Sequence, residues 1–315
     1  MSSTWAITAY YNPSRGVLRR RNYDVFRRRL EAPLLTVEWS ADGHFEIAEG
    51  DADILVRVSG GGRLWQKEAL LNVALSRVPA HCRFVAWLDC DVVFDRPGWS
   101  RTAERLAEHC DLVQLFESAR DLPADAAASG GLDDFPAAEP PGGRDSLLKA
   151  YAAVGRMFTP ADARGSAPAP SGKVGMGYLA RREFLEEVRF YDANVVGGGD
   201  LVLVAALLGR LDELFACRGF SAPHRAHVEH WASELRSALG GRVPRVGWVP
   251  AIVGHLWHGD KRMRRYTERY RILEENRFDP RTDLVREGSG LWNWRDPDGA
   301  IATEVARYLA SRMDG

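Results

Sequence analysis

Short, almost wholly apolar segments alternate along the first part of the chain with segments whose apolar residues fall on one side of a helix. The apolar segments predict strands at residues 5–10, 34–39, 53–58, 84–88 and 111–116. The helical spacing predicts helices at residues 19–30 and 64–75. A strand without a polar face, such as 84–88, is typical of the centre of a sheet covered by helices on both sides. This alternation predicts an α/β fold, a mostly parallel central sheet with helices on both faces.

Two stretches in the middle of the chain lose this periodicity. Residues 119–144 and 159–173 are rich in Ala, Gly and Pro and bury little apolar surface. Because loops of this length are uncommon in compact domains, we expect flexible loops near a functional site, with disordered insertions as the alternative.

The pattern of apolar residues resumes after these loops. It predicts an ordered segment at 174–180, helices at 181–188 and 200–208, a late strand at 252–257 and a charged helix at 261–275. We therefore expect one α/β domain over residues 1–260, with an extension, 261–315, packed on the same domain.

Composition narrows the class of protein. The chain has 315 residues and a net charge of -1, which argues against a dedicated nucleic-acid coat but leaves room for a local basic groove. Its four cysteines are far apart and form no Cys-x-x-Cys pair, as expected for reduced thiols in a cytoplasm. We find no apolar run of the ~20 residues that a membrane span needs, and no signal peptide, so we expect a cytoplasmic protein.

The strongest candidate for chemistry is the triplet Asp89-Cys90-Asp91, which directly follows strand 84–88. Ligands of open α/β sheets bind outside the carboxyl ends of the strands, where both carboxylates can turn toward one cation. Hard oxygen ligands suit Mg²⁺ or Mn²⁺, which can neutralise a diphosphate. The alternative is a pair of solvated aspartates at a strand end, because acidic triplets of this kind also occur by chance.

A second candidate is the pair His255 and His258, which lies at the end of the late strand between Gly254 and Gly259. A neutral imidazole completes a carboxylate–metal site well. We favour His255 as a metal ligand and His258 as a phosphate or sugar contact. A single histidine is more often a surface or core residue, and this remains the alternative.

Two glycine-rich segments precede predicted helices. Gly197, Gly198 and Gly199 place Asp200 on exposed backbone, where it could orient an acceptor hydroxyl or take its proton; a helix N-cap is the alternative. The segment beginning at Gly60 carries Arg63 and Lys67 in the first turns of helix 64–75 and suits an anion. A solvated amphipathic helix is the equally weighted alternative there.

Other charged or imidazole groups carry less weight. His224, His227 and His230 are spaced for one helix face, and we expect that face to be exposed. The arginine runs 19–21 and 27–29 are expected on a solvated face. The basic run that begins at Lys261 follows the histidine pair directly and could close over a diphosphate.

Taken together, the order of these motifs resembles that of the GT-A glycosyltransferases. The resemblance implies that Thr8, Ala9 and Tyr10 lie beside the nucleobase of a nucleotide-sugar. It also implies that Asp91 and His255 are metal ligands and that Asp89 meets the ribose or the metal.

The same resemblance implies an acceptor side. Gly177, Tyr178 and Gly199 correspond to the acceptor-binding segment of inverting members, and Asp200 to their acidic base. The chain differs from that pattern: Tyr178 stands where those members have Trp, and Asp200 lies farther downstream. Whether the transfer is inverting or retaining is left open.

The resemblance thus implies transfer of a hexose from a nucleoside diphosphate sugar, most simply a UDP-sugar, to a hydroxyl with the help of Mn²⁺ or Mg²⁺. The acceptor stays open between a hydroxymethylated DNA base, a glycan and a small metabolite. A non-catalytic nucleotide-sugar binding protein on the same fold is the first alternative. A nucleotidyltransferase is the second, and Arg15-Gly16 at the end of the first strand matches it poorly.

Overall fold

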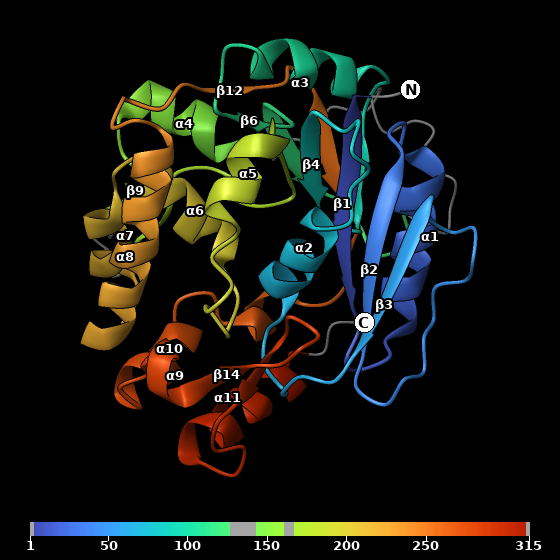
Figure 1. Ribbon diagram of the computed structural model, residues 1–315. Coiled ribbons are helices and arrows are strands. Elements are labelled where there is room, and N and C mark those ends of the chain that lie inside the picture. Colours follow the sequence, from blue (N-terminus) through green and yellow to red (C-terminus); the bar gives the residue numbers. More distant parts are fainter. Residues whose placement is uncertain (1–2, 127–142, 161–166, 313–315) are drawn as a thin grey trace.

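The computed structural model describes residues 3–126, 143–160 and 167–312. A seven-stranded sheet forms its centre, in the order β12-β6-β11-β4-β1-β2-β3 (Figure 1). Its strands, in chain order, are β1 Thr4–Tyr11, β2 Leu34–Ser40, β3 Ile54–Ser59, β4 Phe84–Leu88, β6 Leu112–Gln114, β11 Gly177–Arg181 and β12 Val246–Trp248. Within this sheet β11 runs antiparallel to both neighbours, and the other pairs are parallel. The fold is therefore mixed α/β with a mostly parallel central sheet, as predicted.

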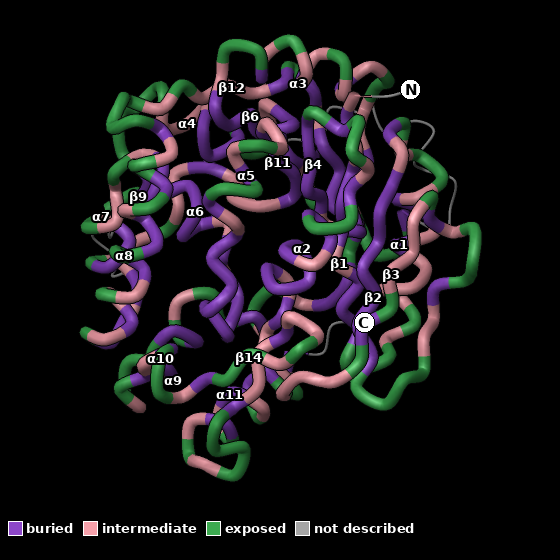
Figure 2. Tube along the Cα trace, viewed as in Figure 1, coloured by how far each residue is buried: buried purple, intermediate pink, exposed green. Residues whose placement is uncertain are grey.

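The central strands are buried on both faces because their residues alternate between two apolar cores. In β4, Val85 and Trp87 join one core, whereas Phe84, Ala86 and Leu88 join the other. All five side chains are buried, which explains why this strand has no polar face. Figure 2 shows the same central strands as the most continuously buried part of the chain.

Helices cover both cores. The first core contains residues of α2 Lys67–Leu75, α5 Arg182–Val188, α6 Gly199–Leu207 and α8 Ala222–Ala238. The second contains residues of α1 Val17–Arg29 and α3 Trp99–Ala107. Two further helices, α4 Leu147–Val154 and α7 Leu211–Cys217, also pack against the first core. In the described part of the chain, no helix is both long and apolar enough to cross a membrane.

A smaller sheet has four strands, in the order β5-β13-β7-β8. Its strands are β5 Val92–Phe94, β7 Ser118–Asp121, β8 Arg144–Asp145 and β13 Ile252–His255. The pair β9 Phe158–Thr159 and β10 Ala169–Pro170 lies apart from it. Within this smaller sheet, β13 thus pairs on both sides with strands that lie far away in the sequence.

The C-terminal segment wraps under the carboxyl-terminal side of the sheet, as the orange and red ribbon of Figure 1 shows. Its elements are η1 Lys261–Arg264, α9 Arg269–Glu275, α10 Pro280–Asp283, β14 Leu284–Arg286, β15 Trp292–Trp294 and α11 Ala300–Ala310. Arg286 lies 2.9 Å from Asp192, and Gln66 donates to the Trp292 carbonyl at 2.6 Å. These contacts fasten the segment to the main domain.

Several predicted elements have different bounds. The helix predicted at 64–75 begins at Lys67, and the one predicted at 261–275 is interrupted, because Arg265 has a positive φ of 41°. The ends of the aperiodic stretches form β7, β8, β9 and β10. Residues 127–142 and 161–166 of the expected flexible loops lie outside the described residues.

The expectation that His224 lies on an exposed helix face is wrong. Its side chain is fully buried, and its ring lies against Tyr191, Phe220 and Phe278. Both ring nitrogens lack a hydrogen-bond partner within the described chain, and burial lowers the pKa of His224 to about 3. Helical spacing could not reveal this, because the aromatic residues around it come from other elements.

Candidate active site

Some of the predicted site residues meet in a cavity of about 550 Å³, which we call the site cavity. They are Ala9, Lys67, Asp89, Asp91, Asp200, His255, His258 and Lys261. The site cavity lies between the carboxyl ends of β1 and β4 and the C-terminal segment. Tyr11, Lys67, Asp91, His255 and Arg269 line it from five different elements or loops. This is the edge at which α/β sheets bind ligands.

Backbone pairing in the smaller sheet brings the metal-ligand candidates together. His255 is in register with Val92, the residue after Asp91, on one side and with Asp121 on the other. The Leu256 amide also donates to the Asp91 carbonyl at 2.8 Å. The side chains of Asp91 and His255 are therefore fixed next to each other by strand register.

We call Asp91, His255 and His258 the Asp91 cluster. His255 Nε2 lies 3.5 Å from Asp91 Oδ1, and His258 Nε2 lies 3.2 Å from Asp91 Oδ2. The two Nε2 atoms are 3.1 Å apart, and one ligand atom from each residue falls within 4.8 Å of the others. The three residues are all buried, with at most 8% of each exposed.

The Asp91 cluster fits a divalent cation. Asp91 Oδ1 is buried and has no hydrogen-bond partner among the described residues, so one carboxylate lone pair faces the cluster unused. A carboxylate with two imidazoles suits Mn²⁺ and also other first-row metals, whereas Mg²⁺ prefers oxygen alone. His255 Nδ1 lies 3.3 Å from Asp121 Oδ1, the kind of outer contact that fixes the orientation of a ligating imidazole.

Arginine side chains surround His258. Arg264 Nη2 lies 2.6 Å from His258 Nε2 and 2.7 Å from Nδ1, and Arg19 Nη2 lies 3.4 Å from Nδ1. Burial, together with the positive charges of Arg19 and Arg264, lowers the pKa of His258 well below its ordinary value. The imidazole is therefore neutral, as a metal ligand must be. A cation bound by His258 Nε2 has to displace the Arg264 guanidinium.

Lys67 joins two further carboxylates of the cavity. Its Nζ lies 2.5 Å from Asp89 Oδ1 and 2.9 Å from Asp200 Oδ2. Burial alone would lower the pKa of Lys67, but Asp200 and Asp89 outweigh it and raise that pKa well above its ordinary value. Conversely, Lys67 outweighs burial at Asp89 and lowers the pKa of that carboxyl. The Trp87 indole donates to Asp200 Oδ1 at 3.3 Å, which fixes the second oxygen.

The structure separates the residues predicted beside a nucleobase. Ala9 and Tyr11 line the site cavity. Thr8 and Tyr10 point to the other face of β1, where Thr8 donates to the Leu88 carbonyl at 2.7 Å and Tyr10 to Glu46 at 3.1 Å. Because side chains alternate along a strand, a run of three consecutive residues cannot face one ligand. Of the three predicted residues only Ala9 lines the cavity, where Tyr11 joins it.

The predicted anion contacts also divide. Lys67 and Lys261 line the cavity, and Lys261 forms an ion pair with Asp121. Arg63 is exposed and does not line it, because the helix begins only at Lys67.

On the predicted acceptor side, Asp200 and Gly198 line the cavity, whereas Gly177, Tyr178 and Gly199 do not. Tyr178 is fully buried and stacks on Trp87, with 5.6 Å between the ring centroids. A Cβ on Gly199 would lie 2.4 Å from Glu68, so this glycine makes room for a buried carboxyl. These three residues therefore lie behind the residues that line the cavity and do not form its surface.

Sequence reasoning missed several cavity residues. Glu68 is 5% exposed, and burial raises its pKa to about 7. Asp121 is the last residue of the short strand β7, which ends inside an aperiodic stretch of the sequence. Arg218 and Arg269 reach the cavity through the packing of the C-terminal half, which no local pattern reveals.

Solved structures of similar fold include glycosyltransferases bound to UDP or a UDP-sugar. S. aureus TarS in complex with UDP-GlcNAc is 10% identical with a TM-score of 0.41, over 82% of this chain and 59% of that chain. Glucosyl-3-phosphoglycerate synthase from Mycobacterium tuberculosis, in complex with Mg²⁺ and UDP, is 12% identical with a TM-score of 0.37, over 98% and 79%. GalNAc-T7 with UDP, GalNAc and Mn²⁺ is 9% identical with a TM-score of 0.38, over 81% and 44%.

The chain thus spans 59% of the length of the TarS chain that it matches. No protein-family model and no curated protein sequence matches it. Likeness at this level describes the arrangement of strands and helices and identifies neither a donor nor an acceptor.

Proposed function

We propose that the protein transfers a sugar from a nucleoside diphosphate sugar, a UDP-sugar in the simplest case, to an acceptor hydroxyl, with Mn²⁺ or Mg²⁺ in the Asp91 cluster. One observation carries the proposal. Asp91 Oδ1 is buried, has no hydrogen-bond partner among the described residues, and lies next to two imidazoles. Two further carboxylates, Asp89 and Asp200, line the same cavity. Because Mg²⁺ prefers oxygen ligands, the two imidazoles favour Mn²⁺.

The residues divide between the two substrates. Asp91, His255 and His258 would hold the cation, which neutralises the charge that develops on the leaving diphosphate. Lys261 and Arg264 lie on the same side and can contact phosphate oxygens. Ala9 and Tyr11 border the place left for the base.

Asp200 is the candidate base. In the transfer, the acceptor oxygen bonds to the anomeric carbon while the bond from that carbon to the phosphate oxygen breaks. The electron pair of the broken bond leaves with the nucleoside diphosphate, and the hydroxyl proton passes to the Asp200 carboxylate. Lys67, at 2.9 Å from Oδ2, and the Trp87 indole, at 3.3 Å from Oδ1, hold that carboxylate in place beside the cavity.

A donor panel tests the proposal. We expect the protein to hydrolyse one nucleotide-sugar slowly in the absence of an acceptor, with Mn²⁺ present and not with EDTA. The panel consists of UDP-, GDP- and dTDP-sugars, each followed by release of the nucleoside diphosphate. Equal turnover with Mn²⁺ and with EDTA would rule the metal-assisted mechanism out.

The first alternative, a nucleotide-sugar binding protein without transfer, requires that no carboxylate stand near the donor. Asp200 shares Lys67 with Asp89, which favours an enzyme. Asp200→Asn separates the two: an enzyme loses turnover and still binds UDP, whereas in a binding protein the substitution changes neither property.

A further inference from the structure

Two buried arginines of the site cavity have no anionic partner among the described residues. Arg218 is 5% exposed and Arg269 is 7% exposed, and both line the cavity. Neither forms an ion pair with a described residue, and the Nε–H of each is buried without a hydrogen-bond acceptor. The rest of each guanidinium makes neutral contacts, Arg218 with the Cys217 and Pro168 carbonyls and Arg269 with aromatic rings.

Such an arrangement is unfavourable without a ligand. A buried charge is costly unless a partner of opposite charge compensates for it, and arginine presents a planar fork that matches phosphate and carboxylate oxygens. Burial lowers the pKa of Arg218, and the positive charge of Arg269 adds to that lowering, whereas neighbouring tyrosines raise the pKa of Arg269 despite its burial. Because both arginines line the same cavity, an anion bound there would compensate the charge of the two guanidiniums.

Arg269 lies on the Asp200 side of the cavity. A Cβ on Gly197 would come within 3.3 Å of Arg269 Nη1, and one on Gly198 within 3.1 Å of Nη2. The guanidinium therefore packs against the glycine turn that leads directly into Asp200. In the described chain, neither Arg269 nor Arg218 hydrogen-bonds to the Asp91 cluster, whereas Arg264 and Arg19 do.

We infer that Arg218 and Arg269 bind an anionic group, a phosphate or a carboxylate, of the acceptor, and that the protein therefore glycosylates a small phosphorylated or carboxylated hydroxy compound. The assignment of this group to the acceptor rests on the proposed function, whereas the anion site itself rests on the buried guanidiniums. It favours a small metabolite over a modified DNA base or a glycan. Buried guanidiniums suit a compact anion that enters the cavity, whereas a polymer backbone is met by exposed cations.

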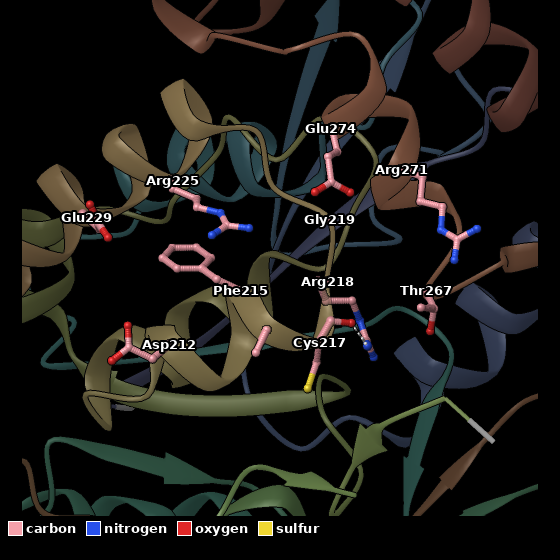
Figure 3. Close-up of a pocket in the computed structure, with 11 residues that line it drawn as sticks. Asp212, Phe215, Cys217, Arg218, Gly219, Arg225, Glu229, Thr267, Arg271 and Glu274 are labelled. Atoms are coloured by element: carbon pink, nitrogen blue, oxygen red, sulfur yellow. Dashed lines mark hydrogen bonds between the residues drawn. The ribbon is translucent and has the colours of Figure 1, made fainter. Parts of the chain in front are cut away.

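Arg218 also defines where this site ends. It lines a second cavity of about 650 Å³, and its guanidinium points to the side of Thr267, away from Arg225 (Figure 3). Thr267 lines both cavities as well. The second cavity contains Glu229 and Glu274 beside its arginines, so its charge is mixed. Arg218 and Thr267 thus mark the boundary between the two cavities.

A binding measurement without donor or metal tests the anion site by itself. We expect inorganic phosphate, in EDTA, to raise the melting temperature of the wild-type protein, because a ligand of the folded state stabilises it. Arg269→Gln should raise the apparent Kd for phosphate about tenfold, the effect of one charge-assisted hydrogen bond, and Arg269→Lys by less. Arg271→Gln is the matched control, since Arg271 lies on the same helix and faces the second cavity.

Matched acceptors then test the substrate class. Glycerol 3-phosphate should exceed glycerol, and glucose 6-phosphate should exceed glucose, as acceptors or as stimulators of nucleoside diphosphate release. Arg269→Gln should reduce transfer to the phosphorylated member at least tenfold more than it reduces donor hydrolysis. A larger effect on the KM of the donor than on that of the acceptor would overturn the inference, since the anion would then be the diphosphate of the donor.

The outcomes separate the two proposals. If the donor is never hydrolysed and phosphate still binds through Arg269, the transferase proposal fails and the anion site stands. Equal phosphate binding by wild type and Arg269→Gln would overturn the anion site. Transfer to hydroxymethylated DNA alone, with no phosphorylated small molecule accepted, would overturn the acceptor class.

Discussion

His258 Nε2 lies 3.2 Å from Asp91 Oδ2, and His255 Nε2 lies 3.5 Å from Oδ1 of the same carboxylate. The sequence predicts His258 as a phosphate or sugar contact and Asp89 beside the ribose or the metal. In the structure, His258 faces the same carboxylate as His255, while Asp89 is paired with Lys67. We therefore propose Asp91, His255 and His258 as the ligand set.

This set predicts that both histidines matter for the metal. His255→Ala and His258→Ala should each weaken Mn²⁺ binding at least about tenfold, because even the loss of an outer partner of a ligand has an effect of that size. Isothermal titration at pH 7.5 without nucleotide measures it. His230→Ala, an exposed histidine of α8, is the control. If His258→Ala binds Mn²⁺ as tightly as wild type, His258 is not a ligand.

Arg264 predicts an effect in the opposite direction. Its Nη2 lies 2.6 Å from His258 Nε2, where it repels a cation and must move to admit one. Arg264→Gln should tighten Mn²⁺ binding about tenfold in the absence of nucleotide, since relief of even a fraction of the repulsion between charges ~4 Å apart amounts to about 1.4 kcal/mol. The same titration measures it, and weaker binding by the variant would show that Arg264 supports the site instead.

Replacement of Glu68 by Gln should stabilise the protein, and the gain should increase with pH. Burial raises its pKa from an ordinary 4.5 to about 7, with Asp200 and Asp89 adding to the effect and Lys67 opposing it. The folded state therefore holds a proton that the unfolded state releases above pH 4.5, and stability falls as pH rises from there to about 7. Glu68→Gln should raise the free energy of unfolding by about 3 kcal/mol at pH 8 and by well under 1 kcal/mol at pH 4.

Denaturant unfolding at the two pH values checks this prediction. Glu187→Gln, at an exposed position of α5, should show no such pH dependence. A gain from Glu68→Gln that is equal at pH 4 and pH 8 would contradict the assigned pKa. Loss of activity in the same variant would in addition give Glu68 a role at Asp200, its neighbour across Gly199.

His224 predicts the complementary behaviour in acid. Its folded-state pKa of about 3 lies below the ordinary 6.5, so the unfolded state gains a proton as pH falls below 6.5 and the folded state does not. The change in unfolding free energy caused by His224→Phe should therefore be about 2 kcal/mol more favourable at pH 5 than at pH 8. The comparison with His230→Phe, at an exposed position of the same helix, isolates the effect of burial.

Whether a site residue can be predicted from the sequence depends on whether a local pattern or long-range packing brings it to the site. Asp91 and His255 each follow or end an apolar strand that the sequence shows, but the antiparallel pairing of β5 with β13, which no local pattern reveals, brings them together. Thr8 and Tyr10 point away from the cavity that Ala9 and Tyr11 line, because side chains alternate along β1. Arg218 and Arg269 were out of reach, since their place depends on how the C-terminal segment docks, through contacts such as that of Arg286 with Asp192.

The most direct test of the central claim is the affinity of UDP for the wild-type protein and for Asp91→Asn, measured by titration with Mn²⁺ and with EDTA. A cation held by Asp91 and the diphosphate links the two ligands. We therefore predict that Mn²⁺ tightens UDP binding at least tenfold in the wild type and leaves it unaltered in Asp91→Asn. Equal tightening by Mn²⁺ in both proteins, or none in the wild type, would contradict the assignment of the Asp91 cluster as the donor's metal site.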